Sequence, residues 1–249
     1  MPHSTDPLAG SVWLRPARSR PGQPALSRDQ IVRAALELLD AEGTEGLSMR
    51  RLAAKLGSGA TSIYWYVANK DELLDLVLDE VMGEVRPSAP AGGDWRDEAR
   101  ALVHELRDTI LRHPWLSTVL GMRPAIGPKA AAMSERVIGF LTRAGFEGLE
   151  LAYANSMLMS HAVGAASMQA AWHITVRRSG MSDAEVRQSL ETHGKSMTAD
   201  RPHYERWWNS IELPEVDRMQ QDAYDFGVDR MLDGLSAWLE RRPAKPETV

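Results

Sequence analysis

Four successive segments between residues 27 and 85 carry apolar side chains at the spacing of an α-helix. In each segment the apolar positions recur three or four residues apart, which places them on one helix face. Gly43 and Gly57 interrupt the pattern, and glycine favours the ends of helices. Because the second and third helices are short, they are stable only against the first, and the pattern predicts a compact three-helix unit. The apolar residues of these three segments are Ile31, Ala34, Ala35, Leu38 and Leu39, then Leu47, Leu52 and Leu56, then Ile63 and Val67.

Polar residues mark where these helices begin. Ser27 is followed three residues later by Gln30, which is the pattern of a capping box. Ser48 can cap the second helix, and Asn69 with Glu72 predicts another capping box at the start of the fourth. The caps and the apolar spacing therefore predict the same boundaries.

Helical patterns fill most of the remaining chain, and no strand pattern of any length occurs. A stretch rich in proline and glycine at 86–93 ends the fourth helix. We expect an all-α protein with a flexible N-terminal arm at 1–26, a helix-turn-helix unit at 27–70 and a larger helical domain at 71–249. The later helices are predicted at 70–85, 95–112, 129–144, 149–176, 182–193 and 215–241.

The third helix carries side chains that the core does not need. Neighbours on a helix are about 100° apart, so three consecutive aromatic residues cannot all point inward with Ile63 and Val67. Small side chains let the helix approach a groove wall, while hydroxyls and ring tips can contact phosphates, base edges and thymine methyl groups. For Tyr64 and Trp65 taken singly, burial as ordinary core aromatics is the alternative. The pattern favours a DNA-reading helix with candidate contacts from Ala60, Thr61, Ser62, Tyr64, Trp65 and Tyr66.

The charges are unevenly distributed along the chain. Residues 10–70 contain nine basic and five acidic side chains, although the whole chain has a formal net charge of −5. A basic reading head on an acidic body suits contact with DNA phosphates. Arg50, at the start of the second helix, is placed for a base edge or a phosphate, and Lys70 is placed for a phosphate.

Composition and missing motifs exclude several classes of protein. The 249 residues include no cysteine, which excludes disulfides and cysteine zinc sites and suits a reducing cytoplasm. No apolar run is long enough to span a bilayer, and the first 26 residues lack the apolar region of a secretory signal. There is no His-x-x-x-His pair, no phosphate-binding glycine-rich loop and no Gly-x-Ser-x-Gly elbow. We expect a cytoplasmic protein with no membrane partner, no catalytic residue, no metal and no cofactor.

A series of short motifs runs from the first helix to the start of the fourth. The motifs are Ile31 to Leu39, Glu42-Gly43, Leu47 to Ala53, Leu56-Gly57, Ile63 to Val67 and Asn69 to Leu74. Together, residues from about 28 to 75 resemble the DNA-binding domain of the TetR family of bacterial transcriptional regulators. By this resemblance, the family's DNA-contact positions fall on Ser48, Arg50, Ala60, Thr61, Ser62, Tyr64, Tyr66 and Lys70.

Two of the later helices carry features of helix association. Residues 152–171 are crowded with alanine, serine and glycine, and the last helix has Gly227 and Gly234 one heptad apart. Packing inside one monomer is the alternative for both helices. A dimer is favoured because two heads on a two-fold axis read a palindrome. In addition, residues 226–235 resemble the closing dimer helix of the TetR branch that includes the tetracycline repressor.

That branch senses small molecules, and the middle helices here carry large, soft or amphipathic side chains suited to lining a pocket. Plain core packing is the alternative for most of them, whereas His161 offers one polar group in apolar surroundings. The candidate ligand contacts are Leu106, Ile110, Trp115, Met122, Met133, Phe140, Met157, His161, Met168 and Trp172.

The loop at 119–124 limits the class of small molecule that we expect in the pocket. It resembles the loop of the tetracycline repressor around its metal-drug site, but Val119 replaces a metal-binding histidine and Met122 replaces a threonine. A magnesium chelate would therefore lose ligands that it needs. We expect a hydrophobic small-molecule effector, with Trp207 and Trp208 either as lid residues or as surface packing.

These observations predict a ligand-responsive DNA-binding transcriptional regulator. Its expected form is a homodimeric repressor that binds a palindromic double-stranded operator and is released by the effector. The alternative is a helical DNA-binding protein with a constitutive or architectural role and no small-molecule ligand.

Overall fold

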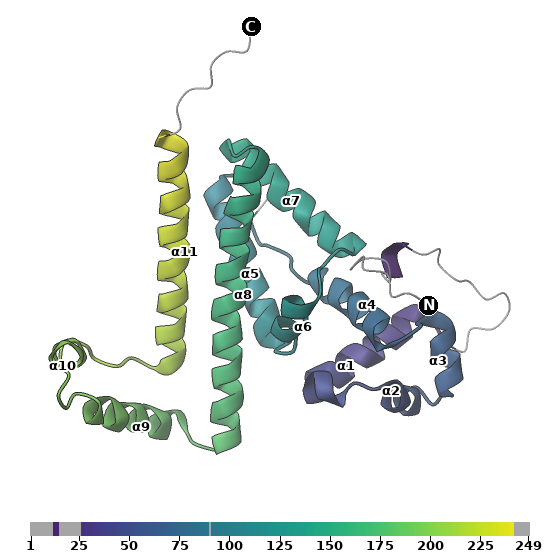
Figure 1. Ribbon diagram of the computed structural model, residues 1–249, viewed down its shortest axis with the longest axis horizontal. Coiled ribbons are helices and arrows are strands. Elements are labelled where there is room, and N and C mark those ends of the chain that lie inside the picture. The colour runs from purple at the N-terminus through teal and green to yellow at the C-terminus, as the bar shows by residue number, and fades with distance from the viewer. Residues whose placement is uncertain (1–11, 15–25, 90, 242–249) are drawn as a thin grey trace, which may run out of the picture. The chain divides into compact units, whose positions relative to one another are not determined.

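The computed structural model describes residues 12–14, 26–89 and 91–241 (Figure 1). These residues form eleven α-helices and one 3-10 turn and contain no β-strand, which confirms the predicted all-α class. The elements are η1 (Val12–Leu14), α1 (Arg28–Gly46), α2 (Met49–Lys55), α3 (Ala60–Tyr66), α4 (Lys70–Met82), α5 (Trp95–Arg112), α6 (Leu116–Met122), α7 (Pro128–Ala144), α8 (Gly148–Ser179), α9 (Asp183–Ser196), α10 (Pro202–Trp208) and α11 (Val216–Arg241).

The chain forms two compact units that divide within α8. The first unit spans Met1–Ala166 and contains η1, α1 to α7 and the first part of α8. The second unit spans Ser167–Val249 and contains the rest of α8 with α9, α10 and α11. The predicted helix-turn-helix therefore belongs to the same compact unit as α4 to α7.

Helices α1 to α3 form a small bundle whose boundaries follow the predicted caps. Ser27 and Gln30 form the expected capping box at the start of α1, and the Ser48 side chain caps α2. Gly57 has a φ of 59°, which suits glycine, and it turns the chain between α2 and α3. Helix α1 extends to Gly46, beyond the predicted end, although Gly43 departs from helical geometry with a φ of 70°. The large buried side chains of the bundle are Ile31, Leu39, Leu47, Leu52 and Ile63.

Helix α4 contacts α1, α6, α7 and η1, and Figure 1 shows it between the bundle and the helices that follow. Its start differs from the prediction in one detail. The Asn69 side chain accepts from the Glu72 N–H at 2.8 Å, as expected, but the Glu72 carboxylate accepts from the Ala68 N–H instead of closing the box on Asn69. The helix ends at Met82, three residues before the predicted end.

A buried carboxylate joins α4 to α7. Asp79, only 4% exposed, accepts from the backbone N–H groups of Lys129 and Ala130, both at 3.0 Å. A helix leaves its first N–H groups without partners inside the helix, so Asp79 caps α7 from another element. A Cβ atom at Gly127 would overlap the Asp79 side chain, so glycine is required for this approach.

Short elements mark the other differences from the prediction. The sequence pattern did not predict α6 or α10, and each has only seven residues. Residues 12–14 lie in the predicted arm, but they form a turn that packs on α4 with Val12 5% exposed. The other arm residues, apart from Leu26, lie outside the described residues.

In the second unit, α9 begins with the predicted Ser182–Glu185 capping box. The Ser182 N–H donates to the Glu185 carboxylate at 2.8 Å, and this bond lowers the pKa of Glu185 below its ordinary value. Helix α10 contributes Tyr204 and Trp208, whose rings stack with centroids 6.0 Å apart. The Trp208 ring lies directly over Gly194, which leaves no room for a side chain there.

Candidate nucleic-acid interface and its coupling to the body

Helix α3 turns polar and aromatic side chains to solvent, as the sequence predicts. Ile63 and Val67 are fully buried, while Thr61 and Ser62 are exposed and Tyr64 is 47% exposed. Trp65 and Tyr66 are half-buried and pack edge to face with ring centroids 4.8 Å apart. Of the two possibilities for Tyr64, the structure selects the exposed one.

The start of α3 suits close approach to a second surface. Its N-cap is Gly59, which has no side chain, and Ala60 follows as the first helical residue. The first N–H groups of a helix have no partners within the helix and can bind a phosphate. The hydroxyls of Thr61 and Ser62 stand beside them on the same exposed turn.

Two adjacent arginines on α2 have different surroundings. The Arg51 guanidinium forms a two-bonded ion pair with the Glu42 carboxylate of α1 and also donates to the Gly46 carbonyl at 3.2 Å. The hydrogen bond to Glu42 and its negative charge raise the pKa of Arg51 further above its already high value. The Arg51 guanidinium is thus already paired inside the bundle. Arg50 is exposed, and among the described residues no ion pair engages it.

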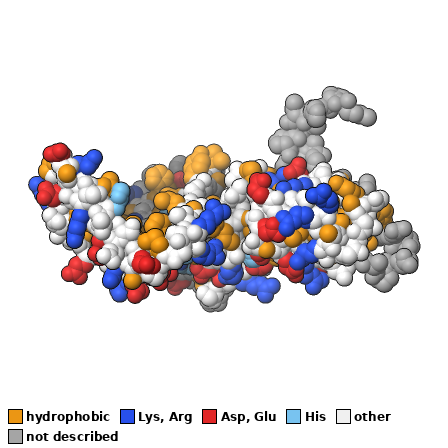
Figure 2. Space-filling model, turned by 90° about the horizontal axis from the view of Figure 1, so that it is seen from below, with side chains coloured by type: hydrophobic (Ala, Val, Ile, Leu, Met, Phe, Trp, Pro, Cys, Tyr) orange, Lys and Arg blue, Asp and Glu red, His pale blue; other side chains and the backbone are white. Residues whose placement is uncertain are grey.

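Lys70 begins α4 at the edge of the bundle. Its Nζ donates to the Thr44 carbonyl at 2.9 Å, which fixes the ammonium group next to the end of α1. An ammonium has three donors, so two remain for a phosphate. Lys55 instead pairs with Glu37 at 2.8 Å. Consistent with such pairs, Figure 2 shows acidic and basic side chains interspersed on the face in view.

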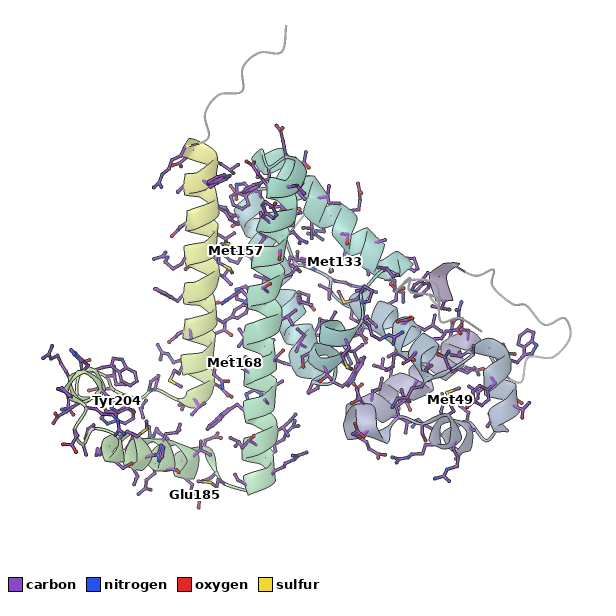
Figure 3. The ribbon with its side chains drawn as sticks, in the orientation of Figure 1. Met49, Met133, Met157, Met168, Glu185 and Tyr204 are labelled. Atoms are coloured by element: carbon purple, nitrogen blue, oxygen red, sulfur yellow. The ribbon has the colours of Figure 1, made fainter. Side chains whose placement is uncertain are left out.

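The predicted ligand contacts fall into different environments. Leu106, Ile110 and Phe140 are buried in the core to which α5 and α7 contribute. Figure 3 labels Met133 on α7 and Met157 and Met168 on α8. Met133 and His161 are half-buried, whereas Met122 and Met157 are exposed. Met168, which is exposed, and Trp172, which is half-buried, belong to the second unit.

Trp115 has a contact that the sequence did not predict. It is buried, and its indole N–H donates to the Asp40 carboxylate of α1 at 2.7 Å. The neighbouring His113 also contacts Asp40. The turn between α5 and α6 is therefore bonded directly to the first helix of the bundle.

Arg123, which follows α6, provides a second connection. Its guanidinium donates to Asp75 at 2.6 Å and to Asp71 at 3.1 Å, both on α4. The bond to Asp75 raises the pKa of Arg123, so the guanidinium stays charged at any physiological pH. Sequence reasoning missed Arg123, Asp75 and Asp79 as functional residues, because their partners lie about fifty positions away along the chain.

Two other features are absent from the described residues. No helix there is long and apolar enough to cross a membrane. No group of three or more histidine or acidic side chains there is arranged to hold a metal ion.

Two family models match the chain. Residues 31–77 match the bacterial regulatory proteins of the tetR family, and residues 86–239 match the tetracyclin repressor-like C-terminal domain. The first range contains the α2–α3 surface described above, and the second covers most of the remaining helices.

Curated relatives and solved structures are similar along most of the chain. An HTH-type transcriptional regulator of Saccharopolyspora erythraea is 40% identical over 92% of both chains. The HTH-type transcriptional repressor DrrR1 of Streptomyces coeruleorubidus is 38% identical, covering 90% of this chain and 82% of its own. The crystal structure of apo ActR from Streptomyces coelicolor superposes with a TM-score of 0.72 at 29% identity, covering 88% of this chain and 99% of its own.

ActR has also been solved in complex with actinorhodin, and that structure is 32% identical to this chain with a TM-score of 0.68, covering 85% of this chain and 99% of its own. The family models, the relatives that match most of the chain and the exposed helix-turn-helix all indicate the same family. The chain belongs to the TetR family of transcriptional regulators.

Proposed function

We propose that this protein is a homodimeric repressor that binds a palindromic operator with α3 in the major groove and releases it on binding a hydrophobic small molecule. The exposed surface of α3 carries this proposal. Thr61, Ser62 and Tyr64 face solvent on a helix whose other side is fixed by two fully buried residues. A rigid helix with polar side chains directed outward is what direct readout of base edges requires.

Around α3, further side chains are suited to orienting the protein on DNA. Exposed Arg50 and the partly free Lys70 ammonium suit contacts with phosphates, and Ser48 at the start of α2 suits a hydroxyl contact. Phosphate contacts would set the register of α3, while Thr61 and Ser62 would read the sequence.

Dimerisation is supported by exposed apolar side chains on the two longest helices. In the first unit, α8 exposes Leu149, Tyr153 and Met157 at four-residue spacing. In the second unit, α11 exposes Phe226, which is 65% accessible, and Trp238. Large apolar side chains exposed on a monomer are typical of a protein–protein interface. Two heads joined in this way would bind the two halves of a palindrome.

Helix α4 is suited to carry the response from the body to the head. Asp79 fixes its C-terminal half to α7, whereas Arg123 bonds its N-terminal half to the end of α6. Displacement of α6 by an effector would therefore pull on the half of α4 nearest to α1 to α3. The head would turn, and the two recognition helices would no longer match successive major grooves.

The side chains around α6 favour an apolar effector. Val119 is buried where the tetracycline repressor uses a metal-binding histidine, and Val119 offers no ligand to a metal. ActR, a structural neighbour, has been solved in complex with actinorhodin, which makes actinorhodin a reasonable first probe. The repressor would act in the cytoplasm, where its operator is.

The test has two steps. Purified protein first selects fragments from the host genome, and the affinity for a selected fragment is compared with that for a scrambled one by fluorescence anisotropy. Actinorhodin and a panel of apolar compounds are then titrated into the complex. Preference for the selected fragment together with release by one compound supports the proposal. Equal affinity for both fragments would rule out the regulator, and tight selective binding that no compound reverses would favour the constitutive binder.

A further inference from the structure

A buried carboxylate lies near the start of α5, where the chain arrives from α4. Glu98 is 1% exposed, on a helix that packs against α7. Its Oε1 atom accepts from the Gly92 N–H at 3.1 Å and from the Arg143 guanidinium of α7. Its Oε2 atom lies 3.9 Å from the Arg136 Nε of α7, too long for a hydrogen bond but within the range of an ion pair. One side chain therefore joins the linker before α5, α5 itself and α7.

The linker between α4 and α5 has a second bond to α7. The Arg136 guanidinium, besides facing Glu98, donates to the Ala89 carbonyl. Gly92, which donates to Glu98, has a φ of 89°, a left-handed conformation that favours glycine. The linker is rich in proline and glycine, yet its described residues are bonded to the helices at two points. We call Glu98, Arg136 and Arg143, with the Ala89 carbonyl and the Gly92 N–H, the linker clamp.

Burial gives the linker clamp more weight than a surface ion pair has. A carboxylate removed from water is costly unless donors and positive charges compensate it. The donors to Glu98 come from the linker and from α7, so these segments must stay together for Glu98 to stay paired. The Arg143 and Arg136 side chains are 46% and 26% exposed, so water can solvate them if the carboxylate is replaced. Opening of the clamp is therefore costly mainly at Glu98.

The linker clamp acts at the same end of α4 as Asp79. Asp79 caps α7 from within α4, and the linker begins at Gly83, about one helical turn later. The C-terminal end of α4 is therefore held to α7 twice, directly by Asp79 and through the linker by the clamp. At the other end of α4, Lys70 donates to the Thr44 carbonyl of α1 in the reading head. Helix α4 thus has one end tied to the body and the other tied to the head.

We infer that Glu98 is a positioning residue for operator binding, whose clamp keeps the C-terminal end of α4 fixed and so sets the orientation of the reading head. This inference rests on the function proposed above. In the proposed dimer, two heads must meet two half-sites at once, and the gain from joint binding is lost when their geometry does not match. One head on a single half-site needs no such match. Loss of the clamp should therefore weaken binding to a whole palindrome and spare binding to half of it.

The experiment compares full-length wild type with Glu98→Gln on a genome-selected fragment and on the same fragment with one half-site scrambled. An amide has one acceptor oxygen in place of two and turns its N–H groups toward a guanidinium, so the clamp opens. We expect Glu98→Gln to lose at least about fivefold in affinity for the intact fragment, the lower end of typical coupling between sites. Its affinity for the half-site fragment should equal that of the wild type. The matched control is Glu105→Gln, which alters another glutamate of α5 paired with an arginine, Arg112, at 3.1 Å. It should bind both fragments as the wild type does.

Hydrogen exchange measured by mass spectrometry gives a second reading that needs no DNA. In Glu98→Gln, the amides of residues 83–94 should exchange about tenfold faster, as expected for the loss of one hydrogen bond to a charged group. Glu105→Gln should leave their exchange unchanged. If Glu98→Gln folds poorly, Arg136→Gln replaces it, because this variant removes the bond to the Ala89 carbonyl while Glu98 keeps Arg143. It should show both effects in smaller size.

Two results would overturn the inference. One is wild-type exchange of residues 83–94 in both clamp variants, which would show that the clamp does not hold the linker. The other is an equal change, or no change, in affinity for the intact and the half-site fragments, which would show that Glu98 does not set the orientation of the head. Failure of the proposed function is distinguishable, because then even the wild type would show no preference for the selected fragment over a fully scrambled one.

Discussion

At the scale of single residues, Arg50 and Arg51 give a matched pair on α2. Arg50 is exposed and free of ion pairs among the described residues, whereas Arg51 is bonded to Glu42 and Gly46. We expect Arg50→Ala to weaken operator binding by about 1–3 kcal/mol, the typical cost of one arginine contact to DNA. The midpoint of thermal unfolding of this variant should stay at the wild-type value, as measured by circular dichroism.

Arg51→Ala is the control for that prediction. Because this side chain joins α1 to α2, its loss should lower the thermal midpoint slightly while leaving the salt dependence of DNA binding unchanged. Binding equal to wild type in Arg50→Ala would remove Arg50 from the interface.

Residue positions on one helix were largely predictable from the sequence. The burial of Ile63 and Val67 and the exposure of Thr61 and Ser62 follow from helical periodicity alone. The contact between His113 and Asp40 was not predictable, because the two residues are 73 positions apart and no local pattern links them. Trp115 was predicted as a ligand contact, and its hydrogen bond to Asp40 gives it a structural role that only the fold reveals.

At the scale of elements, the cap that α4 provides for α7 predicts a clear stability difference. Asp79→Ala leaves two N–H groups at the start of α7 without their acceptor, and we expect a loss of about 1–3 kcal/mol in the free energy of unfolding. Glu80→Ala, one residue later, removes only an exposed ion pair with Lys129 and should cost less than about 1 kcal/mol. Urea unfolding of both variants measures the difference. Similar losses in the two would show that Asp79 does not act as a cap.

The bridge from Arg123 to α4 predicts a functional difference instead. Arg123→Ala should bind the operator with near wild-type affinity but respond less to the effector, because α6 no longer pulls on Asp71 and Asp75. Coupling between two sites is typically worth about 1–3 kcal/mol, so the effector-induced change in operator affinity should fall at least about fivefold. Anisotropy titrations with and without effector measure it. A full effector response in the variant would exclude this bridge as the route.

The long helices were predictable, and so were the short α2 and α3, whereas the equally short α6 and α10 were not. The predicted helix at 95–112 matches α5 at both ends, and 129–144 differs from α7 by one residue at its start. Helices α6 and α10 have seven residues each, too few for an apolar period to repeat, and Pro202 opens the second of them. Tertiary contacts such as the one between α10 and α9 stabilise such short elements.

At the scale of the whole molecule, the proposed dimer predicts that a substitution in its interface halves the mass of the particle in solution. Phe226→Asp places a charge on the exposed apolar face of α11, and we expect the protein to become monomeric. Ile138→Asp, at an exposed apolar position on α7, is the control and should leave the dimer intact. Light scattering after size-exclusion chromatography measures both masses. A wild-type protein that is itself monomeric would contradict the dimer.

The central claim is that the exposed surface of α3 reads the DNA sequence. The most direct measurement is the ratio of affinities for a genome-selected fragment and a scrambled one, in the wild type and in Thr61→Ala, with exposed Thr142→Ala on α7 as the control. If Thr61 contacts a base, the ratio falls in Thr61→Ala by a factor that corresponds to about 1–3 kcal/mol of binding free energy. In the control the ratio stays constant. An unchanged ratio in Thr61→Ala, or an equal loss on both fragments, would contradict readout by this residue.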